Sequence, residues 1–226
     1  MAYQTATIYP SEDYAHTRLL ESTWADARES TTSELNTSAS IVPVYSSRLS
    51  GRGGTTYTNY RYFAIFDVAS AIPYGSAIMS VKIKIWFDNS DGEMRIIKHS
   101  RNSSMNASGV YGSCIYGSGG TNDNGDMIAL SDEFVDNAAF PVVYTTVTLN
   151  KIARELVQNV AGTQGGNSGM FGITLVTKLD YDDDAPSDTT SYDHDIYTDA
   201  YTGTSRDPHL VIEYETPPTL ALGADF

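Results

Sequence analysis

The chain has 226 residues, with 28 acidic against 14 basic side chains and a formal net charge of −14. A surface of that charge repels nucleic acid and anionic lipid, which excludes a protein that binds phosphate backbones. Cys114 is the only cysteine, so no disulfide can form within the chain, and it is expected to be a small, half-buried apolar residue.

Strand patterns dominate the first part of the chain. Residues 6–9 predict a short strand, and residues 11–30, whose periodicity is mixed, are expected to be mostly extended. Residues 40–47 alternate and include Pro43, which favours an edge strand. Glycines in 50–56 predict a loop.

The clearest pattern lies in residues 61–87. Apolar and polar side chains alternate strictly in VKIKIWF (81–87), which is typical of a strand with one buried and one wet face. Val81, Ile83, Ile85 and Phe87 form the predicted buried face, and Lys82, Lys84 and Trp86 form the wet one. Pro73 and Gly75 predict the turn that precedes this strand.

The second half adds a long irregular stretch at 102–137, strands at 142–149, 170–178, 196–202 and 209–215, and one helix. In the helix, Leu149, Ile152, Leu156, Val157 and Val160 form an apolar stripe. Asn150 or Thr148 is the expected N-cap, and Gly162 the expected stop. These elements predict a single antiparallel β domain over 1–215 with one crossover helix and long loops, followed by a tail at 216–226.

Three stretches carry a family resemblance. They are TIYPSEDYAHTRLLESTWADAR, RYFAIFDVASAIPYGSAIMSVKIKIWF, and the set YTTVTLNKIARELVQN, MFGITLV and SRDPHLVIEYE. Together they resemble the DNRLRE-type β-sandwich family, which is similar to jelly-roll carbohydrate-binding modules and is found in phage structural proteins. The DNRLRE string itself is absent, and Ala69 intervenes before Ser70. The resemblance implies a jelly-roll β-sandwich and no particular activity.

Motifs for catalysis are missing from the sequence. His16, His99, His194 and His209 do not stand at metal-ligand spacing, and neither a nucleophile elbow nor a phosphate-binding loop is present. Paired carboxylates for glycoside hydrolysis stay open, since acids are plentiful. We expect a protein that is not an enzyme and that needs no cofactor.

Residues 180–195 hold a dense acidic cluster. Asp180, Asp182, Asp183 and Asp184 offer the hard oxygen ligands that Ca²⁺ prefers, although the spacing is not that of an EF-hand. A structural calcium ion is one hypothesis for this segment. A solvated loop of mutually repelling charges is the alternative.

Sixteen tyrosines raise the question of glycan binding. Most of them alternate within strands, where core and cross-strand packing explains them. Tyr57, Tyr60, Tyr111 and Tyr116 are expected in loops and would form a sugar-stacking platform. Tyrosine is equally typical of protein interfaces.

The tail is expected to bind a partner. Pro217 and Pro218 end the last strand and leave an apolar segment that contains Leu220, Leu222 and Phe226. An anchored extended arm can latch onto an adjacent subunit. The alternative is that this segment folds back onto its own sandwich.

These features favour a structural accessory protein of a phage virion, either a head decoration or a tail-associated subunit, made in the host cytoplasm. Its expected partners are other virion proteins, including copies of itself, and its acidic surface would dock on a basic shell. A glycan-binding module or receptor-binding adhesin is the alternative function.

Overall fold

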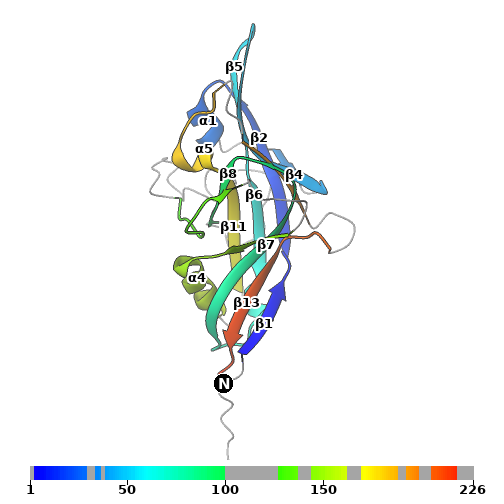
Figure 1. The fold of residues 1–226 in the computed structure, drawn as a ribbon, viewed down its shortest axis with the longest axis vertical. Coiled ribbons are helices and arrows are strands. Elements are labelled where there is room, and N and C mark those ends of the chain that lie inside the picture. Colours follow the sequence, from blue (N-terminus) through cyan, green and yellow to red (C-terminus); the bar gives the residue numbers. More distant parts are fainter. Residues whose placement is uncertain are drawn as a thin grey trace, which may run out of the picture.

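A computed structural model describes residues 3–29, 34–36, 39–99, 127–136, 144–161, 169–187, 192–198 and 205–217. These residues form an antiparallel β-sandwich with a few short helices (Figure 1). The predicted all-β sandwich is confirmed. No helix in the described ranges is long and apolar enough to cross a membrane.

Thirteen strands of the described residues make up the sandwich. They are β1 (Tyr3–Ile8), β2 (Glu12–Glu21), β3 (Glu34–Asn36), β4 (Ile41–Gly51), β5 (Gly54–Tyr60), β6 (Tyr62–Asp67), β7 (Ala77–Asp91), β8 (Glu93–Lys98), β9 (Val135–Asp136), β10 (Tyr144–Thr148), β11 (Met170–Thr177), β12 (Tyr192–Tyr197) and β13 (His209–Glu215). The last strand has the bounds that the sequence predicted.

Four short helices accompany the strands in the described residues: α1 (Trp24–Glu29), α2 (Val68–Ala71), α4 (Lys151–Ala161) and α5 (Lys178–Asp182). The predicted helix is confirmed as α4, and Asn150 is its cap, since its side chain accepts a hydrogen bond from the Ala153 amide at 3.2 Å. The predicted apolar stripe is right for Val157, which is buried, and wrong for Ile152, which is 44% exposed. The other three helices were not predicted. Each spans six residues or fewer, too short for a periodic apolar stripe to emerge.

Hydrogen bonding links the strands in one continuous order, β1-β13-β7-β12-β4-β5-β2-β6-β11-β8-β9. This sheet folds over so that a β7 layer (β1, β13, β7 and β10) packs against a β11 layer (β2, β6, β11 and β8), with β12, β4 and β5 joining the two (Figure 1). The α4 helix contributes Ala153, Val157 and Ala161 to the core between the layers.

The predicted alternation in β7 is confirmed. Val81, Ile83, Ile85 and Phe87 are buried in the core, whereas Lys82, Lys84 and Trp86 are only partly buried on the outer face. Apolar side chains of β6, β11 and β13 meet them from the other strands: Tyr62, Ala64, Phe66, Phe171, Ile173, Leu175, Leu210 and Ile212. Burial of these side chains is the main force that holds the layers together.

One local prediction holds only in part, and a second fails. The β4 strand pairs with β12 over 41–46 and with β5 over 45–51, so among the described strands it has a single neighbour only over 41–44. Pro43 is tolerated because at its position β4 has a strand neighbour on one side only, so its missing N–H costs no second ladder bond. Residues 50–56, predicted as a loop, are the tip of the β4–β5 hairpin, where Gly51 pairs with Gly54.

Gly172 in the middle of β11 has a packing role. A Cβ atom at this position would lie 2.8 Å from the His99 Cβ, which is closer than real Cβ atoms approach. The imidazole of His99 also contacts Phe63 edge-on, with ring centroids 5.5 Å apart. The glycine therefore lets the buried His99 pack closely against strand β11.

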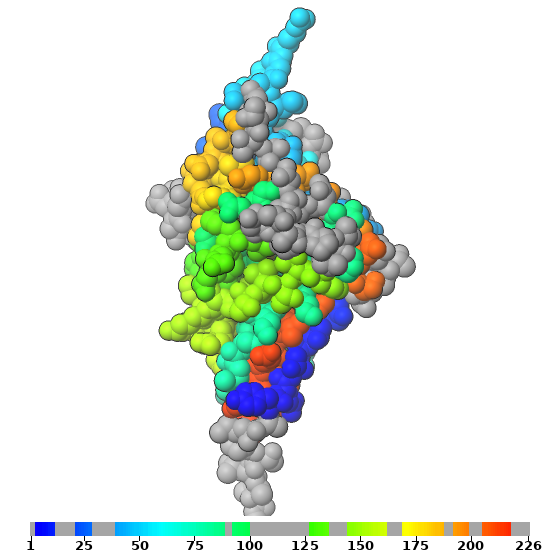
Figure 2. Space-filling model, viewed as in Figure 1, coloured from blue at the N-terminus to red at the C-terminus, as the bar shows by residue number. Residues whose placement is uncertain are grey.

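The sandwich is elongated, and the β4–β5 hairpin projects from one end (Figures 1 and 2). Leu49, near the hairpin tip, is 74% exposed, and Arg52 at the turn is also exposed. We call residues 48–56 the ribbon. A two-stranded ribbon is only marginally stable in water by itself. The ribbon is therefore stabilised mainly at its base, where β4 and β5 join the sandwich.

Candidate functional site

The acidic segment begins with a buried ion-pair cluster. Asp180 is completely buried, and Arg61 donates to both of its carboxylate oxygens, with 2.7 Å from Nη2 to Oδ1. Arg28 donates from Nε to the same Oδ1 at 3.2 Å and from Nη2 to the Asp180 backbone carbonyl at 2.8 Å. We call Arg28, Arg61 and Asp180 the charged anchor.

Local structure positions this anchor. Thr177 caps α5 by accepting a hydrogen bond from the Asp180 amide at 3.2 Å. Burial raises the pKa of Asp180, but the two guanidinium groups outweigh it and the net pKa lies below the ordinary carboxylate value. The anchor therefore stays ionised, and it fastens α1 and α5 to the start of β6.

The calcium hypothesis finds no ligand set at these residues. The carboxylate oxygens of Asp180 accept hydrogen bonds from the two arginines, Asp182 pairs with Lys178, and Asp183 pairs with Arg28. Asp184 is exposed. Within the part of the chain that the structure describes, no group of three His, Cys, Asp or Glu side chains is arranged to hold a metal ion. The segment is also not a loop at its start, because 178–182 form α5.

The proposed glycan tyrosines are not placed as expected. Tyr57 and Tyr60 lie in strand β5 rather than in a loop. Both are half-buried: the ring of Tyr57 contacts Trp24 at 6.2 Å and that of Tyr60 contacts Tyr45 at 5.9 Å between centroids. Tyr111 and Tyr116 lie outside the described residues. Cross-strand packing against β4 explains Tyr60, and packing against helix α1 explains Tyr57.

A different group of aromatic rings gathers on the outer face of the β7 layer. The ring of Tyr144 contacts Trp86 at 5.2 Å and His209 at 5.0 Å, and His209 contacts Tyr9 at 5.3 Å. We call these four residues the aromatic face. Arg206 lies over the Trp86 ring, 5.1 Å from its centroid.

The electrostatics of the aromatic face follow from its partial burial. Burial, together with the nearby Tyr9 and Asp207, raises the pKa of Tyr144 to about 12. Burial, with a smaller effect of Lys84, lowers the pKa of His209. Tyr144 is thus a neutral hydrogen-bond donor, which it uses on the Asp207 carbonyl at 3.0 Å. The sequence predicted Trp86 on the solvent-facing side of its strand. A tryptophan at such a position was the one feature of the sequence that pointed to this aromatic cluster.

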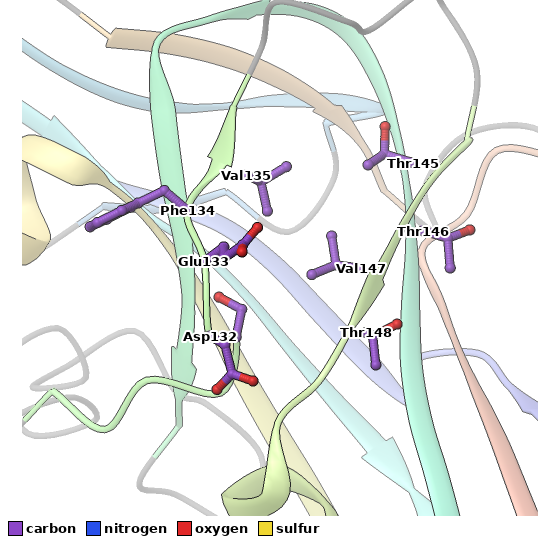
Figure 3. A pocket seen from close by; sticks show the side chains of 9 residues that line it. Asp132, Glu133, Phe134, Val135, Thr145, Thr146, Val147 and Thr148 are labelled. Atoms are coloured by element: carbon purple, nitrogen blue, oxygen red, sulfur yellow. The ribbon is translucent and has the colours of Figure 1, made fainter.

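A groove of about 390 Å³ opens beside β10 (Figure 3). One wall is formed by 131–135, and the other by the edge of β10 over 145–148. The lining is mainly hydroxyls and apolar carbons, with the exposed carboxylates of Asp132 and Glu133 at the rim. Its described lining residues include neither histidine nor cysteine, and they can donate and accept hydrogen bonds.

The predicted tail site is described only at its first residue. Pro217 is exposed and lies against Gly75, because a Cβ there would be 3.7 Å from its Cγ. Pro218, Leu220, Leu222 and Phe226 lie outside the described residues. The latch hypothesis stays a prediction.

No model of a known protein family matches the chain, and no curated protein matches it.

Proposed function

We propose that the chain is a non-catalytic structural accessory subunit of a phage virion, which acts by protein–protein assembly. The single observation that carries the proposal is the ribbon. It projects beyond the sandwich and leaves Leu49 74% exposed (Figure 2). A large exposed apolar side chain at the end of a two-stranded projection gains stability once a neighbouring surface covers it.

Charge supports the same proposal. The ribbon tip carries the exposed Arg52, whereas the whole chain has a formal net charge of −14. The projecting end therefore differs in sign from the chain as a whole, and it suits an acidic partner surface. Such complementarity fixes orientation and raises the rate of association more than it raises affinity. The resemblance to phage β-sandwich domains agrees with this role.

The test is to locate the chain on particles of a phage whose genome encodes it. Immuno-electron microscopy with an antiserum against the purified chain should label virions at repeated positions. A chain that carries Leu49→Ser together with Arg52→Ser should fold but fail to be incorporated, whereas Ser50→Ala serves as a control in the same ribbon. Absence of label from intact and from disrupted virions would refute the proposal.

A second function, glycan binding, is favoured by the aromatic face. Tyr9 is 43% exposed, and Trp86 and Tyr144 are half-buried beside the cationic Arg206. Flat rings next to a guanidinium group suit sugar rings that carry acidic substituents. In a glycan-array screen, Trp86→Ala should remove any binding, while Tyr57→Ala should preserve it. Glycan binding that is lost in Tyr57→Ala and kept in Trp86→Ala would instead place the glycan site on strand β5.

A further inference from the structure

Strand β1 is an open edge of the sandwich. It stands first in the strand order and pairs only with β13 among the described strands. Its six residues run along the surface of the molecule beside β13 (Figures 1 and 2). A free edge presents a row of backbone N–H and C=O groups that can pair with another strand.

The β1 edge lacks the usual protection against such pairing. Its sequence, YQTATI, contains no charge and no proline, and its register with β13 runs without a bulge. The strand at the other end of the order, β9, is only two residues long. Short length is a common protection of an edge, as are charge, proline and a bulge, and β1 has none of them.

The two faces of β1 are well separated. Ile8 is buried, and Gln4 accepts a hydrogen bond from the Tyr214 hydroxyl at 3.0 Å, so the even-numbered residues face inward. Tyr3 is 72% exposed, which places the odd-numbered side chains on the outer face. A partner strand must respect this alternation, since a slip of one residue would exchange the faces.

A second copy of the same strand satisfies this condition. In an antiparallel pair related by a two-fold axis, Thr5 can lie opposite Thr5 with Tyr3 opposite Thr7. Shifting the axis by one residue places Ala6 opposite Ala6. Both registers keep outer residues opposite outer residues, and neither brings two charges together. Uncharged β-branched pairs such as Thr–Thr are favourable across strands.

The β1 strand adds no charge of its own to the approach of a like-charged copy, although Glu215 stands in register with Tyr3 at its start. The chain carries a net charge of −14, so copies repel one another over most of their surface. Beside β1, Glu213 pairs with Lys82 at 3.1 Å and accepts from Ser80 at 2.7 Å. The acid opposite Thr5 is therefore neutralised locally.

We infer that β1 pairs antiparallel with β1 of a second copy, which joins the β7 layers of two molecules into one sheet. This deepens the proposed assembly function and rests on it. The pairing is isologous, and it leaves the ribbon of each copy free to contact other virion proteins.

The test introduces a charge at the centre of the pairing. In the folded monomer, Thr5→Lys faces Glu213, its cross-strand neighbour, so folding should be preserved. In the pair, the new lysines come close together across the axis, and the dissociation constant from sedimentation velocity should rise by roughly tenfold or more. Thr146→Glu is the matched control. Thr146 lies on β10 opposite Lys84 of β7, away from strand β1, and the new carboxylate can pair with that lysine. Circular dichroism and melting temperature confirm folding.

A second measurement does not depend on charge. In a Cys114→Ser background, Thr5→Cys or Ala6→Cys should form a disulfide-linked dimer under mild oxidation, depending on the register, while Thr146→Cys should not. Hydrogen exchange at the β1 amides should also slow as the chain concentration rises.

Three outcomes would overturn the inference. A wild-type chain that is monomeric at every concentration would do so, and it would leave assembly with other virion proteins to the labelling test above. Self-association that survives Thr5→Lys would place the contact elsewhere. Self-association that is lost on deletion of residues 218–226 but retained in Thr5→Lys would assign it to the tail.

Discussion

The two layers of the sandwich are held together in a different way from the two helices beside the ribbon. The layers meet through an apolar core built largely from β6, β7, β11 and β13. Helices α1 and α5 bury Trp24, Ala27 and Leu179, and the charged anchor joins the two helices to each other and to the start of β6. Apolar packing is non-directional and spread over many side chains, so no single contact decides it. The anchor depends on one carboxylate and on its ionisation.

The strongest test of this contrast removes the charge of Asp180. Asp180→Asn removes the buried carboxylate that both Arg28 and Arg61 contact and leaves Arg28 with the half-exposed Asp183, so the free energy of unfolding should fall by about 4 kcal/mol. Guanidinium denaturation measures it. Asp184→Asn, at an exposed position, should change the value by less than about 0.5 kcal/mol. A fall of less than about 1 kcal/mol for Asp180→Asn would show that the anchor contributes little.

The apolar core should respond in another manner. Ile83 is completely buried between the layers, and Ile83→Ala should cost about 3 kcal/mol through lost transfer energy and the remaining cavity. Ile41→Ala deletes the same atoms at a partly exposed site and should cost less than about 1 kcal/mol. The difference between the two variants should be the same at neutral and at mildly acidic pH, because neither involves a titrating group.

The contrast also explains what the sequence could and could not reveal. Ile83 and its neighbours were predictable because strand alternation is a local pattern. The anchor joins residues 28, 61 and 180, and no short window contains that pairing. From the sequence, Asp180 is therefore predicted as one acid among many in a loop.

The sequence likewise predicts Tyr57 in a loop, because the glycines nearby indicate a turn. In the structure these glycines form a tight hairpin tip, and Tyr57 lies in the strand that follows it. The uncharged edge of β1 is visible in the sequence, but its lack of a second neighbour is a property of the topology.

Acid should weaken the fold through a second buried group. His194 is buried in β12, and burial lowers its pKa from 6.5 to about 4. The folded state thus favours the neutral imidazole, while the unfolded chain takes up a proton as the pH falls below 6.5. Stability is full above that pH and declines toward about 4, by up to about 3 kcal/mol.

Comparing His194→Gln with the wild type over this range isolates the effect, because the variant should lose the part of the slope that His194 contributes, whereas His209, whose pKa burial also lowers, contributes equally to both chains. The anchor acts in the same direction at lower pH. The depressed pKa of Asp180 means that its contribution is present above the ordinary carboxylate pKa and is lost as the pH falls through the folded value. A wild-type chain whose stability is flat between pH 6.5 and 4 would contradict the role of His194.

The smallest change in the free energy of unfolding is expected at the start of α4, where a polar cap and apolar packing both stabilise the helix. Asn150 caps the helix through the Ala153 amide and donates to the Ala129 carbonyl at 3.0 Å, while Val157 packs the same helix into the core. Asn150→Ala should cost about 1 kcal/mol, because the apolar face holds α4 in place without its cap. Asn150→Asp keeps the capping acceptor and loses only the donor to Ala129, so it should recover part of the loss. If Asn150→Ala instead cost as much as Asp180→Asn, α4 would depend on polar fastening as strongly as α1 and α5, and the division between a packed sandwich and anchored helices would not hold.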